Sequence, residues 1–420
     1  MARGRSLIHT TFLCLTFCLL SPALWAQLDD FNSAVKQYDE GQYEGAAKAF
    51  EATTAAQPDF ESGWYYLGLA RLKLTDYEGA LAAFQKAVDL APTRPGTRLM
   101  VGQIYESQKA YAEAIKVYQD ELRYRRGKDI LPVMTALGRA LYYSGRYNDA
   151  VTTLDRVVTE DIHYVEALYY LALSHASLKN HTQALKYYDR AGTTLDEWSG
   201  LVTRLSRLRQ LQTKGGITPA QQREIGSAEE QLAQDYGRAQ DFATVLGLWP
   251  TLNKARGHSL LAMKEWSAAR TAYRQALDKE KRGSPSDADA YTLIALASLE
   301  QGKSVFLDNS LLFEMIDILK DAEKQAKEAI KKNAAFAPAH NALGEVYLFQ
   351  AKTYTTKPEL KITSHTFEDA IKEFQEALKT DPNYVRAMRN TAECLLLSGK
   401  AEEARDQLNK ALALEPKRDD

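Results

Sequence analysis

A spacing of 34 residues recurs along almost the whole chain, and it limits the possible folds more than any other feature. Small residues and prolines both follow it, near the beginning and near the end of the sequence. The clearest sets are Ala46, Ala80 and Ala114; Pro58 and Pro92; Ala370 and Ala404; and Pro382 and Pro416. A fixed period of this size is typical of proteins in which one small helical unit stacks on copies of itself.

The length of the chain and its composition favour the same interpretation. With 420 residues the chain exceeds what one ordinary hydrophobic core accommodates, so it forms either several domains or a repeat array. Alanine, leucine, lysine and glutamate recur throughout, proline is sparse, and no segment shows the period-two alternation of a strand. We therefore expect an all-α protein whose helical hairpins bury their apolar faces against one another.

The residues between the periodic marks form a recognisable motif. Its clearest copy consists of Trp64, Leu67, Gly68, Tyr77, Ala80, Phe84, Ala87 and Pro92. Weaker copies follow along the rest of the chain, including a stretched one near residues 288–336. This pattern resembles the tetratricopeptide repeat (TPR) family. The resemblance implies a TPR superhelical solenoid of about nine helix-turn-helix repeats, interrupted by a helical insert.

Each motif position has a mechanical interpretation. Gly68 lies where the two helices of a hairpin cross closely, and a larger side chain there would push them apart. Tyr77 and Phe84 fill the space between hairpins, and Pro92 ends a second helix because it cannot continue one. A glycine or polar residue before the second helix permits the tight turn. These residues are expected to build the fold rather than to bind a partner.

The spacing also divides the chain. We expect a signal peptide over residues 1–26, five TPR repeats over 27–198, a non-TPR or degenerate helical hairpin over 199–249, and about four repeats over 250–420. In the insert, Leu201, Leu205, Leu208 and Leu211 form one helical stripe, and Thr218-Pro219 is a favourable helix start. Two of the later repeats carry extra residues between their helices, which are either contact surfaces or neutral loop drift.

The first 26 residues predict export. Arg3 and Arg5 precede a mostly apolar run over residues 7–20, Pro22 ends the run, and Ala26 is a small residue suited to cleavage. The run is short for a membrane span, although an uncleaved anchor is an alternative. Cleavage would remove two of the three cysteines and leave Cys394 without an internal disulfide partner. We expect an exported protein of a bacterial periplasm, with no integral membrane span after cleavage.

Charge and motif searches argue against other functions. The formal net charge of −2 implies no basic face, so nucleic acid is not an expected partner. Residues 297–304 satisfy a loose phosphate-loop pattern, but a helix is expected before them and the first glycine is missing. The histidines lack metal-ligand spacing, and Cys394 reads as a small buried hydrophobe. We expect no enzyme, no catalytic residues, no metal and no cofactor.

The TPR resemblance implies a binding groove on the first helices of successive repeats. The motif places there Phe31, Val35, Tyr38, Tyr65, Leu69, Leu72, Gln103, Arg139, Tyr142, Tyr143, Tyr169 and Leu173. Tyrosine offers a large contact area at low entropic cost, which suits a binding surface. The alternative for each side chain is packing between hairpins. The family's carboxylate clamp for chaperone C-termini is absent, because Phe31 occupies its first lysine position.

These observations favour a protein–protein interaction scaffold, or adaptor, of the cell envelope that binds protein or peptide partners. Two other classes stay open. One is a self-assembling structural component of an envelope complex, in which repeats of different copies stack end to end. The other is a small-molecule-binding regulator or enzyme that uses the central insert, where only ordinary Arg, Gln and Glu side chains are found.

Overall fold

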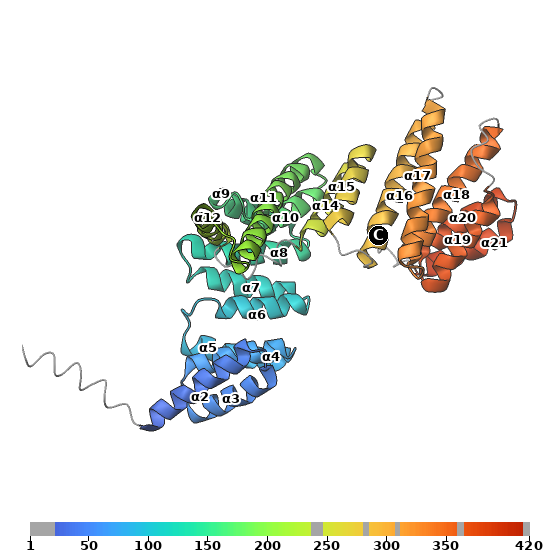
Figure 1. Cartoon of the computed structure of the whole chain (residues 1–420). Coiled ribbons are helices and arrows are strands. Elements are labelled where there is room, and N and C mark those ends of the chain that lie inside the picture. The colour runs from blue at the N-terminus through green and yellow to red at the C-terminus, as the bar shows by residue number, and fades with distance from the viewer. Residues whose placement is uncertain (1–21, 237–246, 280–284, 307–310, 359–364, 415–420) are drawn as a thin grey trace, which may run out of the picture. The chain divides into compact units, whose positions relative to one another are not determined.

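The computed structural model describes residues 22–236, 247–279, 285–306, 311–358 and 365–414. Helices and short turns account for these residues, and none of them lies in a strand. The helices of the described residues pair in chain order into nine hairpins, and α12 is an additional helix (Figure 1). The expected all-α solenoid of about nine TPR-like repeats is therefore confirmed.

The chain divides into two compact units, residues 1–160 and 161–420, which are described separately. Unit 1 contains four hairpins. Its elements are α2 (Pro22–Asp39), α3 (Tyr43–Ala56), α4 (Glu61–Lys73), α5 (Tyr77–Leu90), α6 (Thr97–Ser107), α7 (Tyr111–Leu122), the 3-10 helix η1 (Gly127–Ile130), α8 (Leu131–Tyr143) and α9 (Tyr147–Glu160). The second helix of each of the first three hairpins packs on the first helix of the next, so the stack follows the sequence.

Unit 2 contains five hairpins and the additional helix α12. Its elements are α10 (Val165–Ser177), α11 (His181–Thr213), α12 (Pro219–Tyr236), α14 (Trp249–Ala262), α15 (Trp266–Lys279), α16 (Pro285–Val305), α17 (Leu312–Lys332), α18 (Ala337–Thr356), α19 (Phe367–Thr380), α20 (Val385–Leu397) and α21 (Ala401–Leu414). Helix α14 packs on α11, so the stack continues across the insert.

A close helix crossing recurs inside the hairpins. A Cβ atom on Gly68 would lie 2.6 Å from Cε1 of Phe84, a residue 16 positions later that is fully buried. The same conflict exists between Gly102 and Tyr118, where the distance would be 2.1 Å. Because real Cβ contacts are essentially never this short, only glycine leaves room for the aromatic ring at this crossing.

The turns inside the hairpins share one left-handed residue. Gly41, Gly145 and Gly399 adopt φ angles of 81°, 80° and 78°. Non-glycine residues take the same conformation at the equivalent place in other hairpins. They are Thr75, Lys109, Lys179 and Lys264. The turn geometry is therefore imposed by helix packing even where the side chain disfavours it.

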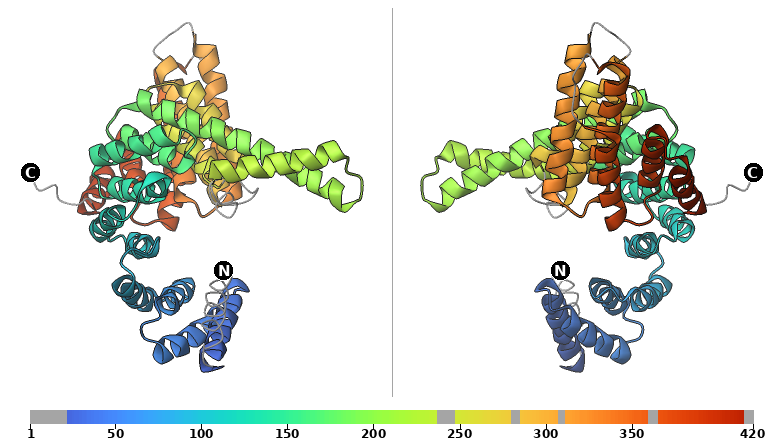
Figure 2. Two further views of the ribbon diagram at one scale, coloured as in Figure 1. Left: turned by 90° about the vertical axis from the view of Figure 1, so that its left-hand side faces the viewer. Right: turned by 90° about the vertical axis from the view of Figure 1, so that its right-hand side faces the viewer.

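The expected insert is built from a long helix and its return. Helix α11 starts as the second helix of its hairpin and continues without a break across residue 199 to Thr213. After a turn at Gly215, α12 packs back on α11 around Leu205, Leu208 and Ile225. In both views of Figure 2 this α11–α12 pair projects beyond the other helices of unit 2. Residues 237–246 lie outside the described part of the chain.

The extra residues of the two stretched repeats mainly lengthen helices. Helices α16 and α17 have 21 residues each and α18 has 20, whereas α10 and α20 have 13. The added turns pack together, because Phe306 meets Phe349 edge-to-face at 5.8 Å and both rings pack against the buried cluster that contains Met315 and Leu319. The added segments are thus partly core.

The first residues of the chain bear on the export prediction. Residues 1–21 lie outside the described residues, and the signal peptide stays a prediction. Helix α2 begins at Pro22, so cleavage after Ala26 would remove its first turn.

Candidate functional site on the first helices of the hairpins

The predicted groove residues of the first hairpin are largely used for packing. The ring of Phe31 lies edge-on to Phe60 at 5.0 Å and to Tyr66 at 5.6 Å. Val35 and Tyr38 are also half-buried against the cluster around Phe50. Packing between hairpins, the alternative considered for each groove residue, describes these three.

The predicted groove residues of the second hairpin are also used for packing. Tyr65, Leu69 and Leu72 are half-buried against the cluster that contains Phe84. The guanidinium of Arg94 lies 4.1 Å from the centre of the Tyr65 ring, in a cation–π arrangement. One face of Tyr65 is thus covered by a charged group of the same unit.

An ion pair joins the first helices of the third and fourth hairpins. Nε of Arg139 on α8 donates to Oε1 of Glu106 on α6 at 3.1 Å, and Nη2 donates to Oε2 at 2.6 Å. The hydroxyl of Tyr118 donates to the same carboxylate at 2.8 Å. Burial, followed by the Glu106 charge, raises the pKa of Tyr118, so the phenol stays protonated. The bidentate contact between Arg139 and Glu106 fixes the planar guanidinium of Arg139, one of the predicted groove residues.

An aromatic cluster follows directly along α8. The ring of Tyr143 stacks on Tyr111 at 5.5 Å with an interplanar angle of 16°, and it meets Tyr142 at 5.2 Å. Tyr142 in turn lies 5.7 Å from Tyr147. Tyr143 is 50% exposed, the largest exposure among the described tyrosines. We name Tyr111, Tyr142 and Tyr143 the tyrosine platform. Tyr111 is not among the predicted groove residues, and the sequence indicates it only through its 34-residue spacing from Tyr77.

The remaining predicted residues differ among themselves. Gln103 is exposed on α6, one turn before Glu106. In unit 2, Tyr169 is buried and meets Tyr170 at 5.2 Å, and Leu173 is half-buried. Because Tyr169 and Leu173 belong to the other unit, they are not grouped with the tyrosine platform.

Unit 2 carries a polar cluster that sequence analysis missed. Oε1 of Glu345 on α18 accepts hydrogen bonds from Asn341 at 2.7 Å and from Asn390 at 3.1 Å. Arg386 on α20 reaches the same carboxylate, with its Nη2 atom 2.8 Å from Oε2. Asn341 and Glu345 are buried, and their partners satisfy them. The cluster sets how α20 lies on α18.

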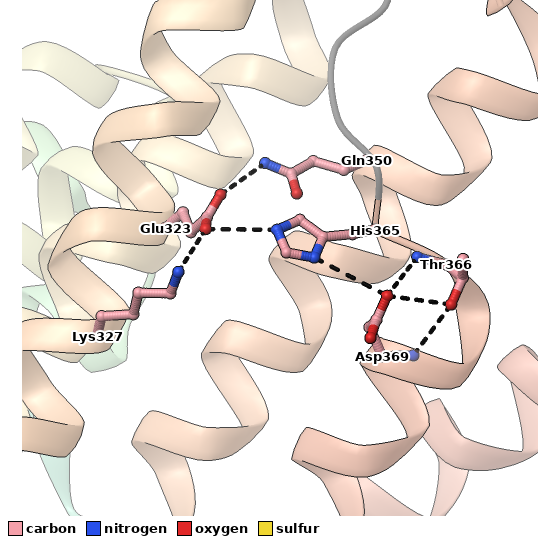
Figure 3. Close-up of polar contacts among 6 residues, drawn as sticks. All are labelled: Glu323, Lys327, Gln350, His365, Thr366 and Asp369. Carbon is pink, nitrogen blue, oxygen red and sulfur yellow. Dashed lines mark hydrogen bonds and ion pairs between the residues drawn. The ribbon is translucent and has the colours of Figure 1, made fainter.

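A second polar cluster joins α17, α18 and the start of α19 (Figure 3). Glu323 accepts hydrogen bonds from Lys327 at 2.7 Å and from Gln350 at 3.4 Å, and Nε2 of His365 lies 3.4 Å from it. Burial alone would raise the pKa of Glu323, but the hydrogen bonds from Lys327 and Gln350 outweigh it and lower the pKa. The imidazole of His365 also stacks on Tyr347 at 3.8 Å.

The start of α19 completes this cluster. Thr366 caps the helix, since its hydroxyl accepts from the backbone of Asp369 at 3.3 Å while the Asp369 carboxylate accepts from the Thr366 backbone at 2.8 Å. The pKa values of Glu323 and Asp369 are both lowered, so both carboxylates are ionised and paired. Neither has the near-neutral pKa of a general acid or base. We interpret the cluster as a junction between hairpins.

Residues 297–304 lie within the regular helix α16, so no loop exists there to surround a phosphate. Cys394 is fully buried, and burial raises its pKa to about 12. Among the described residues, no group of three or more His, Cys, Asp or Glu side chains is arranged to hold a metal ion. No described helix combines the length and the apolar character needed to cross a bilayer.

The repeats, their crossings and their turns together define a helical repeat protein of the solenoid class. Two family models described as "Tetratricopeptide repeat" match the sequence, one over residues 32–95, 135–194 and 254–304 and the other over residues 362–420. The matched residues make up more than half of the chain. The chain therefore belongs to the tetratricopeptide repeat family, and this membership supports a protein–protein interaction scaffold.

Curated relatives match only in part. The chain is 38% identical over 58 residues to the heat-shock protein cognate co-chaperone sgt12 of Aspergillus fumigatus. It is 32% identical over 169 residues to the Superkiller complex protein 3 of Mus musculus. These alignments cover 14% and 40% of this chain but only 17% and 9% of the relatives.

Several solved TPR structures resemble parts of the fold. MamA from Desulfovibrio magneticus covers 39% of this chain and 92% of its own length, with 18% identity and a TM-score of 0.37. PilW, described as a widely conserved type IV pilus biogenesis factor, covers 53% of this chain and 98% of its own, with 16% identity and a TM-score of 0.36.

Proposed function

We propose that this protein is an interaction scaffold of the cell envelope, and that the first helices of unit 1 bind an extended peptide or a helix of a partner protein. The proposed contact region comprises the tyrosine platform, Gln103 and Arg139. The export part of the proposal rests on the basic and apolar segments of the first 26 residues. The binding part rests on the geometry of α6, α7 and α8.

One observation carries the binding proposal, namely the exposed ring of Tyr143. Tyr111 and Tyr142 hold that ring from two sides, so its orientation is fixed before a partner arrives. A fixed aromatic side chain loses little entropy on binding, which is why such residues dominate binding energy in protein interfaces. Arg139, held by Glu106, adds a donor-rich edge on the same helix.

Other predicted groove residues, such as Phe31 and Tyr65, are half-buried within the protein and are less exposed than Tyr143. Phe31 and Tyr65 contact a partner only through the parts that their own packing leaves open. We therefore expect their replacement by alanine to lower stability before it lowers binding. Tyr143 separates the two effects, because half of its surface is already in water.

A crosslinking experiment tests the proposal. A photoreactive phenylalanine analogue is placed at position 143 of the full chain, and the cells are irradiated before envelope proteins are isolated. We expect one or a few defined adducts. The matched control carries the same analogue at Tyr354 of α18, which is 47% exposed in unit 2. Equal adducts from both positions, or none from position 143, would contradict the proposed site.

A variant completes the test. Tyr143→Ala should abolish recovery of the partner identified by crosslinking while leaving the thermal midpoint nearly unchanged, and Tyr354→Ala should leave recovery intact. Retention of the partner by Tyr143→Ala would reject the platform as the binding surface. Fractionation of the cells, with mass spectrometry of the mature N-terminus, tests export and cleavage after Ala26 separately.

A further inference from the structure

Five leucines of the α20–α21 hairpin are exposed to solvent. Leu396 and Leu397 at the end of α20 are 53% and 47% exposed, and Leu408, Leu412 and Leu414 on α21 are 38%, 63% and 41% exposed. Leu408 and Leu412 are one helical turn apart, so they share one side of α21. We name Leu396, Leu408 and Leu412 the leucine face. Exposed apolar groups gathered in this way mark interaction sites more often than isolated ones do.

The same motif positions are covered in the preceding hairpin. Leu396 corresponds to Leu348 of α18, and Leu408 corresponds to Phe374 of α19. Phe374 lies beneath Gly344 of its own hairpin, and both Leu348 and Phe374 belong to one buried cluster with Ala387 of α20. Leu412 corresponds to Leu378, which packs into the same cluster as Phe374. Helix α20 packs on α18 and α19 and belongs to this covered interface. The leucine face therefore has apolar residues at the same motif positions as the α18–α19 surface on which α20 packs.

The charges at the edge of this surface are repeated as well. Where α20 lies on α18, its Arg386 pairs with Glu345 and its Glu393 pairs with Lys352. In the α20–α21 hairpin, Glu393 of α20 corresponds to Glu345, and Lys400, in the turn after α20, corresponds to Lys352. The receiving hairpin thus presents a carboxylate and an amine in the same order and spacing as the hairpin before it. Charges arranged in this way select the register of an incoming helix more than they add to affinity.

We propose that the leucine face binds an amphipathic helix of a partner protein whose chemistry matches that of α20. Such a helix carries an arginine and, seven residues later, a glutamate, with small and apolar residues on the side between them. The arginine would join Lys352 at the carboxylate of Glu393, the glutamate would meet Lys400, and the apolar side would cover Leu396, Leu408 and Leu412. This surface lies in unit 2 and is independent of the tyrosine platform.

The test uses a synthetic peptide of residues 383–399 with Cys394→Ser, labelled with a fluorophore, and the full chain. Fluorescence anisotropy should show saturable binding in the micromolar to millimolar range, since a short helix is only partly formed in water. A peptide with Arg386→Glu and Glu393→Arg should bind about tenfold more weakly, because both edge pairs become repulsive. Equal affinity for the two peptides would overturn the proposal.

Variants of the chain complete the experiment. The double variant Leu396→Glu and Leu412→Glu should abolish peptide binding and keep the circular dichroism spectrum, because both side chains are more than half exposed to water. Glu393→Arg in the chain should restore binding of the peptide that carries only Arg386→Glu. Tyr143→Ala should bind the peptide unchanged, which separates this surface from the proposed groove.

The oligomeric state of the full chain tests whether a second copy of the chain covers the leucine face. Light scattering of the full chain should give a monomer mass, with no change in the double leucine variant. A dimer that dissociates in that variant would show that a second copy, rather than a partner helix, covers the leucine face. Peptide binding that survives the double variant would also reject the proposal.

Discussion

Gly102 of α6 and Tyr118 of α7 compete for the same space, because a Cβ atom on the glycine would lie 2.1 Å from Cε1 of the tyrosine ring. The Tyr118 ring is fully buried, and its hydroxyl is held by Glu106, so it has little freedom to move aside. Gly102 makes room for Tyr118, Tyr118 donates to Glu106, and Glu106 accepts from Arg139 of the next hairpin. Substitutions at these positions should therefore change the stability of the protein.

Gly102→Ala should destabilise the protein by about 2–3 kcal/mol, because overpacking in a rigid core forces backbone shifts. Chemical denaturation followed by circular dichroism measures the change. Gly226→Ala on α12 is the matched control, since nothing lies within 4 Å of its Cβ position. It should be neutral or stabilise by about 0.5–1 kcal/mol, as alanine does inside a helix. Similar losses for the two variants would contradict the crossing argument.

Thr75→Gly should stabilise unit 1 by up to about 1 kcal/mol. Thr75 has a φ angle of 61°, which a β-branched residue disfavours and glycine adopts freely. Lys109→Gly, at the equivalent turn with a φ angle of 59°, should gain less because lysine is not branched at Cβ. Thermal unfolding of the two variants distinguishes them, and a lower midpoint for Thr75→Gly would argue against a strained turn.

Arg139→Met should cost about 2 kcal/mol, because it leaves the carboxylate of Glu106 largely buried without its cation. The double variant Glu106→Gln and Arg139→Met should cost clearly less. It contains no unpaired charge, and the amide oxygen still accepts from Tyr118. Urea unfolding of the single and double variants gives the comparison. Additive losses would mean that the two side chains do not interact.

The histidine at position 340 predicts a pH-dependent contribution to stability. Its Nδ1 atom lies 2.8 Å from Oε2 of Glu373 and its Nε2 atom 3.1 Å from the carbonyl of Ala334. Both neighbours are acceptors, so only the protonated ring donates to both. The hydrogen bond to Glu373 is the largest cause of a raised His340 pKa, which burial partly offsets.

The sign of the effect follows from that direction. A raised folded pKa stabilises the protein fully below the unfolded pKa of about 6.5, and the contribution disappears as the pH rises through the folded value. The difference in melting temperature between wild type and His340→Gln should therefore be larger at pH 5.5 than at pH 8.5. Glu373→Gln should flatten this dependence. A difference that grows with pH would refute the assignment.

Much of the fold could be predicted from residue spacing. The glycine at the crossing meets the bulky residue 16 positions later inside one hairpin, and the 34-residue period repeats this pair along the chain, so both leave a regular pattern in the sequence. The burial of Cys394 among apolar neighbours was also predicted from its helix and is confirmed. These features depend on short-range packing, which stays the same from copy to copy.

The candidate site was harder to predict, because it depends on which residues of neighbouring hairpins meet. Arg139 and Glu106 are 33 residues apart and Arg386 and Glu345 are 41 apart, since the second pair spans a stretched repeat. The fixed period alone does not indicate either partner. Likewise, extra residues in the sequence predicted insertions, but only the structure distinguished longer helices from loops.

By itself, the sequence determined that this chain folds as stacked helical hairpins, because small and bulky residues at fixed intervals allow helices to pack in one way only. The tertiary structure alone decided which side chains of the first helices stay open to a partner. Tyr143 is exposed and Tyr169 is buried, although both are predicted groove residues on first helices. Their difference arises from the neighbouring helices, which cover one ring and only support the other.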